Sequence, residues 1–359
     1  MAEPFKELFN QKFVTDLESA IHKVHPSFNT GEFQNSVLDE NWADRELKQR
    51  MRHISESLRP YLPSDYVQAI DILKNASEGF SGLAHIVFAD FVEVFGLDHF
   101  DASVNALELF TQNSSAEFAV RPFIVKYPQE MMQQMGKWAR ASNEHLRRLS
   151  SEGCRPRLPW AMALPVFKKD PSPVLKILEL LKNDPSEYVR KSVANNLNDI
   201  SKDHPEIVLK TAGEWLNKTA ETDWIVKHGC RTLLRVGNTK ALLLFGYQEP
   251  DHVEITELCV TPSIKLGESI DFNFTITADN GKLGKLRLEY IIEFMKANGK
   301  TSPKIFKISE GIFTVKQRQI TKSHSFRPIT TRKYYPGKHG LRIVINGTEK
   351  SNTEFVVFE

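Results

Sequence analysis

Two carboxylates interrupt what is otherwise a set of basic helical stripes. Residues four apart on a helix share one face. This spacing gives three stripes: Arg148/Glu152, Lys191/Asn195/Asp199 and Lys227/Arg231/Arg235. Basic side chains in this arrangement suit a phosphodiester backbone, whereas a carboxylate among them repels phosphate. Glu152 and Asp199 are therefore costly unless they perform chemistry or hold a basic neighbour. The alternative is that the stripes are solvated helix faces with ion pairs such as that of Arg148 with Glu152.

The apolar spacing predicts helices up to about residue 246. Val174, Ile177, Leu178 and Leu181 form one apolar helix face. A five-residue pattern of acidic, apolar, apolar, any and basic residues also recurs. Its copies are 117–121, 144–148 (with His145 at the first apolar position), 187–191 and 223–227. The last three copies begin 43 and 36 residues apart. Separations of about 35 to 47 residues are typical of HEAT-type helical pairs, which stack into a solenoid with a concave surface. We expect the three stripes to lie on that surface.

The apolar period changes to two after residue 250. Residues 269–276, 285–290 and 340–345 alternate as strands do, and Asn298-Gly299 and Asn346-Gly347 are turn signals. About seven strands in this length predict an immunoglobulin-like β-sandwich, with a small antiparallel barrel as the alternative. The sequence thus predicts a mainly α chain with a HEAT-like solenoid at 1–246 and a sandwich at 251–359.

A loop signal lies beside Glu152. Gly153, Pro156 and Pro159 surround two arginines, Arg155 and Arg157, and are followed by Trp160. Glycine and proline at these places end one helix and set Trp160 at the start of the next. An aromatic side chain among these charges is a candidate for contact with a ligand, although a lone Trp is more often part of a core.

Four segments resemble the AlkC branch of the AlkD-like DNA alkylation-repair glycosylases. They are Glu117-Phe118-Ala119-Val120-Arg121-Pro122-Phe123, Ser151-Glu152-Gly153, Arg155-Pro156-Arg157-Leu158-Pro159-Trp160, and Ser192-Val193-Ala194-Asn195-Asn196-Leu197-Asn198-Asp199. The resemblance spans the helical part to about residue 246. It implies a HEAT-like fold and, for some members, an immunoglobulin-like C-terminal domain. It also implies metal-free, monofunctional hydrolysis of the N-glycosidic bond of positively charged alkylated bases such as 3-methyladenine, without an enclosed base-flipping pocket.

The resemblance also implies roles for individual residues. Asp199 and Glu152 would form the electrostatic pair that stabilises an oxocarbenium-like sugar, one of them also orienting water, and Glu117 would be a third acid. Trp160 would contact the lesion nucleotide through its ring. The remaining candidates are expected to bind DNA, most of them at phosphates near the lesion: Arg148, Arg155, Lys191, Asn195, Lys227 and Arg231.

Composition and termini narrow the class of protein. The 359 residues are 41% hydrophobic and 26% charged, as in folded proteins. No apolar run is long enough for a membrane span, and the first residues do not form a signal peptide. The three widely spaced cysteines fit a reducing cytosol. We therefore expect a cytoplasmic monomer that needs no metal or other cofactor and acts on double-stranded DNA containing alkylated bases.

The sequence also allows two alternative functions. Solenoids are often non-catalytic scaffolds for other proteins, and a basic surface also fits structure-specific DNA binding without cleavage. Residues 251–359 contain 17 Lys and Arg against 12 Asp and Glu. Their basic stretch from Lys316 to Lys333 either contacts DNA or is a charged sheet face that guards an edge strand.

Overall fold

The structure is a computed structural model that describes residues 5–279, 281–329 and 332–359. It forms two compact units. The first contains the chain up to residue 204 together with residues 215–229, and the second contains residues 205–214 and the chain from residue 230 onward. The change from helices to strands falls between Leu244 and Val253, so the second unit includes short helices as well as the sandwich.

Sixteen α-helices lie within the described residues. They are α1 (Gln11–Val24), α2 (Thr30–Val37), α3 (Leu47–Leu58), α4 (Tyr66–Ala76), α5 (Ile86–Phe95), α6 (Phe100–Asn113), α7 (Val120–Lys126), α8 (Pro128–Trp138), α9 (Glu144–Gly153), α10 (Pro165–Lys169), α11 (Ser172–Leu181), α12 (Glu187–Ile200), α13 (Pro205–Trp215), α14 (Ala220–Gly229), α15 (Arg231–Arg235) and α16 (Thr239–Leu244). The predicted apolar face of 174–181 is the buried face of α11.

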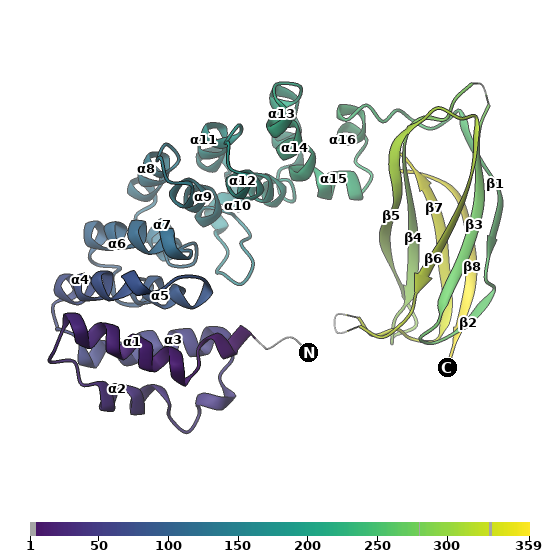
Figure 1. Cartoon of the computed structure of the whole chain (residues 1–359). Helices are drawn as coiled ribbons and strands as arrows, with labels where there is room; N and C mark the ends of the chain where they lie inside the picture. The colour runs from purple at the N-terminus through teal and green to yellow at the C-terminus, as the bar shows by residue number, and fades with distance from the viewer. Residues whose placement is uncertain (1–4, 280, 330–331) are drawn as a thin grey trace. The chain divides into compact units, whose positions relative to one another are not determined.

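The helices of the first unit stack in two layers (Figure 1). One layer contains α1, α4, α6, α8 and α11. The other contains α3, α5, α7, α9, α12 and α14, in which α3 packs on α5, and α12 packs on both α9 and α14. The recurring acidic-to-basic pattern begins α9 and α12, lies within α14 and runs into the first two residues of α7. All four copies therefore belong to one layer, as a HEAT-like solenoid requires.

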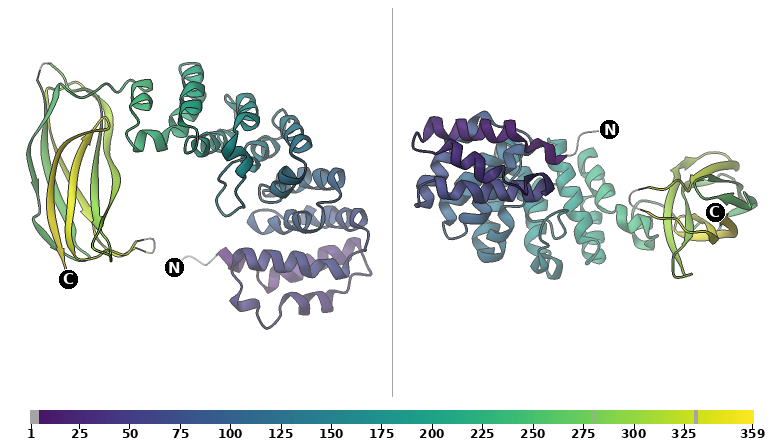
Figure 2. Two further views of the ribbon diagram at one scale, coloured as in Figure 1. Left: turned by 180° about the vertical axis from the view of Figure 1, so that it is seen from behind. Right: turned by 90° about the horizontal axis from the view of Figure 1, so that it is seen from below.

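The strands of the second unit form two sheets (Figure 2). They are β1 (Val253–Val260), β2 (Ser263–Lys265), β3 (Ser269–Ala278), β4 (Gly284–Met295), β5 (Thr301–Phe313), β6 (Gln317–Ser325), β7 (Gly337–Ile345) and β8 (Thr348–Phe358). The sheet orders are β1-β3-β6 and β2-β8-β7-β4-β5. Two sheets packed on one core make a sandwich, as predicted, rather than a closed barrel.

Local signals in the sandwich sequence have the expected structural effect. Ile270, Phe272, Phe274 and Ile276 alternate into the core from β3. The turn between β7 and β8 has positive φ angles at both Asn346 (47°) and Gly347 (82°). That combination defines the type I′ turn that an Asn-Gly pair favours in a hairpin.

Candidate active site

The end of α9 brings Glu152 into a buried place. Asn143 caps the helix by accepting a hydrogen bond from the backbone N–H of His145 at 2.8 Å. The last residues of α9, from Leu149 to Gly153, are buried. A Cβ atom on Gly153 would lie 2.6 Å from Cγ2 of Val120. Glycine therefore allows the end of α9 to pack closely against α7, which sets the position of Glu152.

Arg155 joins two acids from different helices. Its Nη1 donates to Oε1 of Glu152 at 2.7 Å, and its Nε donates to Oδ2 of Asp199, near the end of α12, at 2.9 Å. All three side chains are buried, with Asp199 only 2% exposed. Burial alone would lower the pKa of Arg155, but the two carboxylates outweigh it and raise this pKa above its ordinary value. The residues form a Glu152–Arg155–Asp199 triad with one net negative charge.

Lys202 and a second pair complete the charge pattern. Lys202 donates to Oδ1 of Asp199 at 3.2 Å. Glu117 accepts from Nη1 of Arg148 at 2.9 Å, and the Arg148 guanidinium lies 4.9 Å from the ring centre of Tyr188 on α12. Arg148 also approaches Glu152, with 3.6 Å between Nη2 and Oε1. The three predicted acids thus share one cluster of ion pairs.

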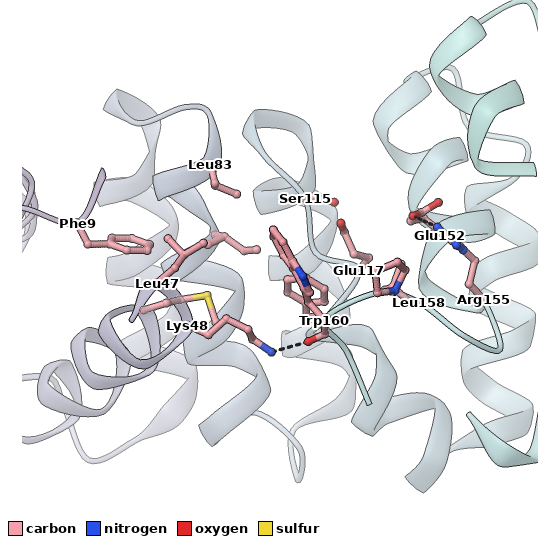
Figure 3. A pocket seen from close by; sticks show the side chains of 14 residues that line it. Phe9, Leu47, Lys48, Leu83, Ser115, Glu117, Glu152, Arg155, Leu158 and Trp160 are labelled. Atoms are coloured by element: carbon pink, nitrogen blue, oxygen red, sulfur yellow. Dashed lines mark hydrogen bonds and ion pairs between the residues drawn. The ribbon is translucent and has the colours of Figure 1, made fainter. Parts of the chain in front are cut away.

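Trp160 stands at the tip of the loop that joins α9 to α10. Because α10 begins at Pro165, the prediction that Trp160 starts the next helix is wrong. Trp160 is 68% exposed, and its backbone has a left-handed φ of 64°. Its carbonyl oxygen accepts a hydrogen bond from Nζ of Lys48 on α3 at 2.8 Å (Figure 3). Because bulky residues seldom adopt this backbone conformation, the tip is a functional candidate.

A cavity of about 290 Å³ connects Trp160 with the acids. Most of its wall is apolar, and Glu117, Glu152 and Arg155 supply charge at the side opposite Phe9 and Leu47 (Figure 3). Its lining consists of Phe9, Leu47, Lys48, Met51, Leu83, Ile86, Ser115, Glu117, Phe118, Glu152, Arg155, Leu158, Pro159 and Trp160. Asp199 is not among these residues and is linked to the cavity through Arg155.

The sequence-predicted DNA-binding residues occupy different environments. Arg148 and Arg155 are engaged by carboxylates as described. Lys191 is exposed and pairs with Glu187 on its own helix at 2.7 Å, which is the solvated-face alternative considered above. Oδ1 of Asn195 lies 3.3 Å from Nε2 of His228. Lys227 is exposed on α14, and Arg231 is partly exposed at the start of α15 in the second unit.

Arg121 is a site residue that sequence reasoning missed. It is fully buried, and it donates from Nε to the carbonyl of Met162 at 2.7 Å and from Nη1 to those of Gly153 and Arg155 at 2.8 and 2.9 Å. Burial lowers its pKa to about 10. Arg121 therefore holds the base of the Trp160 loop. Arg121 occupies the basic position of the recurring pattern at 117–121, and this position was the one feature of the sequence that could have identified it.

The remaining reactive groups of the described residues were candidates for a metal site or a nucleophile. Among the residues that the structure describes, no group of three or more His, Cys, Asp or Glu side chains is placed to hold a metal ion. Cys154, which directly precedes Arg155, is buried, and burial raises the pKa of its thiol to about 12.

None of the helices among the described residues has the length and apolar character of a membrane span.

Two family models and a curated relative match this chain. The family model described as "DNA alkylation repair enzyme" matches residues 104–233, and that of the YhaZ C-terminal Ig-like domain matches residues 254–359. The uncharacterized protein YhaZ of Bacillus subtilis is 46% identical over 98% of this chain and 99% of its own.

A solved structure also matches this chain over its whole length. The alkylpurine DNA glycosylase AlkC of Pseudomonas fluorescens, bound to DNA containing an abasic site analog, is 38% identical with a TM-score of 0.94. The match covers 99% of this chain and 100% of that one. The chain therefore belongs to the AlkC/AlkD-like family of DNA alkylation repair enzymes, in its AlkC branch.

Proposed function

We propose that this protein is a monofunctional DNA glycosylase that excises positively charged alkylated bases of the 3-methyladenine type. The observation that carries the proposal is the convergence of Glu117, Glu152 and Asp199 in one cluster, of which Glu117 and Glu152 line a cavity together with the exposed Trp160. Support comes from the whole-length likeness to an alkylpurine DNA glycosylase. The protein would act as a monomer in the cytoplasm on double-stranded DNA.

The chemistry fits a site without a strong general acid. A cationic alkylated base is already a good leaving group, so the enzyme need not protonate it. As the N-glycosidic bond breaks, positive charge develops on the sugar. One carboxylate about 4 Å from that charge stabilises it by about 4 kcal/mol at an effective dielectric constant near 20. This corresponds to roughly a thousandfold in rate.

The ion pairs reduce that figure. Arg155 is shared by Glu152 and Asp199, and Lys202 also contacts Asp199. We therefore expect roughly a hundredfold loss when one acid is neutralised. Glu152 lines the cavity and Asp199 supports it through Arg155, and one of the two orients the attacking water. The ring of Trp160 would contact the lesion nucleotide, where cation–π attraction favours positive charge.

Contact with the duplex is assigned to residues outside the acid cluster. Lys191, Asn195, Lys227 and Arg231 would bind the DNA, the charged ones at phosphates, whereas Arg148 and Arg155 are assigned to the carboxylates. Lys316, Arg318 and Lys322 on or beside the edge strand β6 would also contact the DNA backbone. Reversing these three charges in the full chain should flatten the dependence of log affinity on log salt. An unchanged slope would leave them as guards of the sheet edge.

The test is the release of 3-methyladenine from methylated DNA by the wild type, Asp199→Asn and Glu152→Gln. We expect release by the wild type and losses of about a hundredfold in each variant, with the larger loss marking the acid that orients water. Glu187→Gln removes an exposed acid from α12 and should retain full activity. DNA binding without release would indicate a structure-specific DNA-binding protein, and neither property would indicate a scaffold.

A further inference from the structure

The backbone of Trp160 needs an outside support. Its φ of 64° is a left-handed conformation that L-residues with large side chains disfavour. Trp160 as a whole is 68% exposed, so burial contributes little to holding it there. Pro159 restricts the residue before it, and the amide of Leu164 returns to the carbonyl of Pro156 at 3.2 Å. These contacts shape the loop but do not engage Trp160 itself.

Lys48 supplies a contact to Trp160 from across the cavity. Its Nζ donates to the Trp160 carbonyl at 2.8 Å and lies 5.0 Å from the ring centre of Phe118, which also lines the cavity (Figure 3). The start of α3 is fixed by a capping box in which the backbone N–H of Glu46 donates to Oε1 of Gln49 at 2.8 Å. Lys48 therefore reaches the loop from a rigid helix end.

The two supports of the loop differ in kind. Arg121 holds the base of the loop through three carbonyls and is fully buried. Lys48 is exposed and holds only the tip. Loss of Arg121 would disturb the core, whereas loss of Lys48 would release Trp160 and leave the Glu152–Arg155–Asp199 triad intact.

We propose that Lys48 is a positioning residue that holds Trp160 in its left-handed conformation, and thereby fixes the orientation of the tryptophan ring beside the acids. The effect of Lys48 on base excision rests on the proposed glycosylase function. Its effect on the position of Trp160 does not depend on that function. Lys48 would act on excision through Trp160 rather than through DNA or the acids.

The first measurement is independent of catalysis. Trypsin is specific for Lys and Arg, and Arg157-Leu158 is a bond of this loop that it could cleave. Mass spectrometry would identify that cleavage in the full-length protein without DNA. Lys48→Met retains most of the aliphatic stem but removes the donor, so cleavage at Arg157–Leu158 should accelerate severalfold. Lys48→Arg retains a donor and should restore protection. Lys12→Met on α1, which removes an exposed lysine paired with Asp16, is the matched control. Equal cleavage in Lys48→Met and wild type would overturn the inference.

The second measurement is a double-mutant cycle on single-turnover release of 3-methyladenine. Lys48→Met should slow release about tenfold, and Lys48→Arg should recover most of it. In a Trp160→Ala background, Lys48→Met should have no further effect. An equal loss in both backgrounds, or no loss in either, would refute action through Trp160. If the wild type releases no base, the proposed function fails, and the trypsin result still decides the placement of the loop.

Discussion

Replacing Arg155 with methionine should destabilise the helical unit strongly. Arg155 is 7% exposed, and its guanidinium donates to Glu152 at 2.7 Å and to Asp199 at 2.9 Å. Methionine fills similar space but leaves two buried carboxylates without their shared cation. Breaking a buried ion pair by removing one partner costs about 3–5 kcal/mol. That is a large part of the stability of an ordinary domain.

Arg157 provides a matched control two residues further along the same loop. It pairs with Asp203 at 2.6 Å, but the two side chains are 37% and 23% exposed. Water and salt screen such a pair, so Arg157→Met should cost about 0–1 kcal/mol. The two arginines look alike in the sequence, and burial alone predicts their different effects.

Urea unfolding followed by tryptophan fluorescence measures both variants. All five tryptophans lie between residues 42 and 224, within the first compact unit, so the signal reports on that unit. With a slope of about 2 kcal/mol per molar urea, Arg155→Met should lower the midpoint by about 1.5–2.5 M. Arg157→Met should lower it by less than about 0.5 M. Equal shifts would refute the reasoning that the buried triad depends on Arg155.

Two further predictions concern packing and pH. Gly153→Ala places a Cβ 2.6 Å from Val120, so it should lower the free energy of unfolding by about 1–3 kcal/mol and slow base excision by displacing Glu152. Gly136→Ala is the control, because its Cβ would lie no closer than 3.8 Å to the side chains packed around it. In urea unfolding it should be neutral or slightly stabilising. Burial lowers the pKa of His85 to about 4 from an ordinary 6.5, so its neutral form contributes stability that is present above pH 6.5 and is lost as the pH falls toward 4. This loss is about 2.5 kcal/mol at pH 4.5, and His85→Leu should abolish it. Urea midpoints of both proteins at pH 7 and pH 4.5 measure the difference, and an equal acid loss in the two would contradict the assignment.

Periodicity identified the elements because their signals are local. The apolar face of α11 and the Asn346-Gly347 turn depend on residues within one helix or hairpin. The acids Glu152 and Asp199 could be proposed because carboxylates in a basic stripe are unusual. Their shared contact with Arg155 could not be predicted, because Arg155 and Asp199 are 44 residues apart and meet only through the packing of α9 on α12.

The contacts that hold the Trp160 loop could not be predicted from the sequence for a related reason. Lys48 and Arg121 bind backbone carbonyls, which leave no residue-type signal in the partner. Lys48 is 112 residues from Trp160, and Arg121 is 32 to 41 residues from the carbonyls that it holds. The phosphate contact of Arg155 is a prediction from the resemblance. The sequence did not reveal that this side chain is buried between two carboxylates, because burial cannot be read from a residue type.

The most direct test of the electrostatic role compares two DNA duplexes that differ only in the charge at the abasic sugar. One carries a neutral tetrahydrofuran analogue, and the other carries a pyrrolidine analogue that is protonated at neutral pH and mimics the oxocarbenium-like sugar. The wild type should bind the cationic duplex about tenfold or more tightly than the neutral one. Asp199→Asn and Glu152→Gln should each lose most of that preference while binding the neutral duplex as before. Equal wild-type affinity for both duplexes, or an unchanged preference in both variants, would contradict the account.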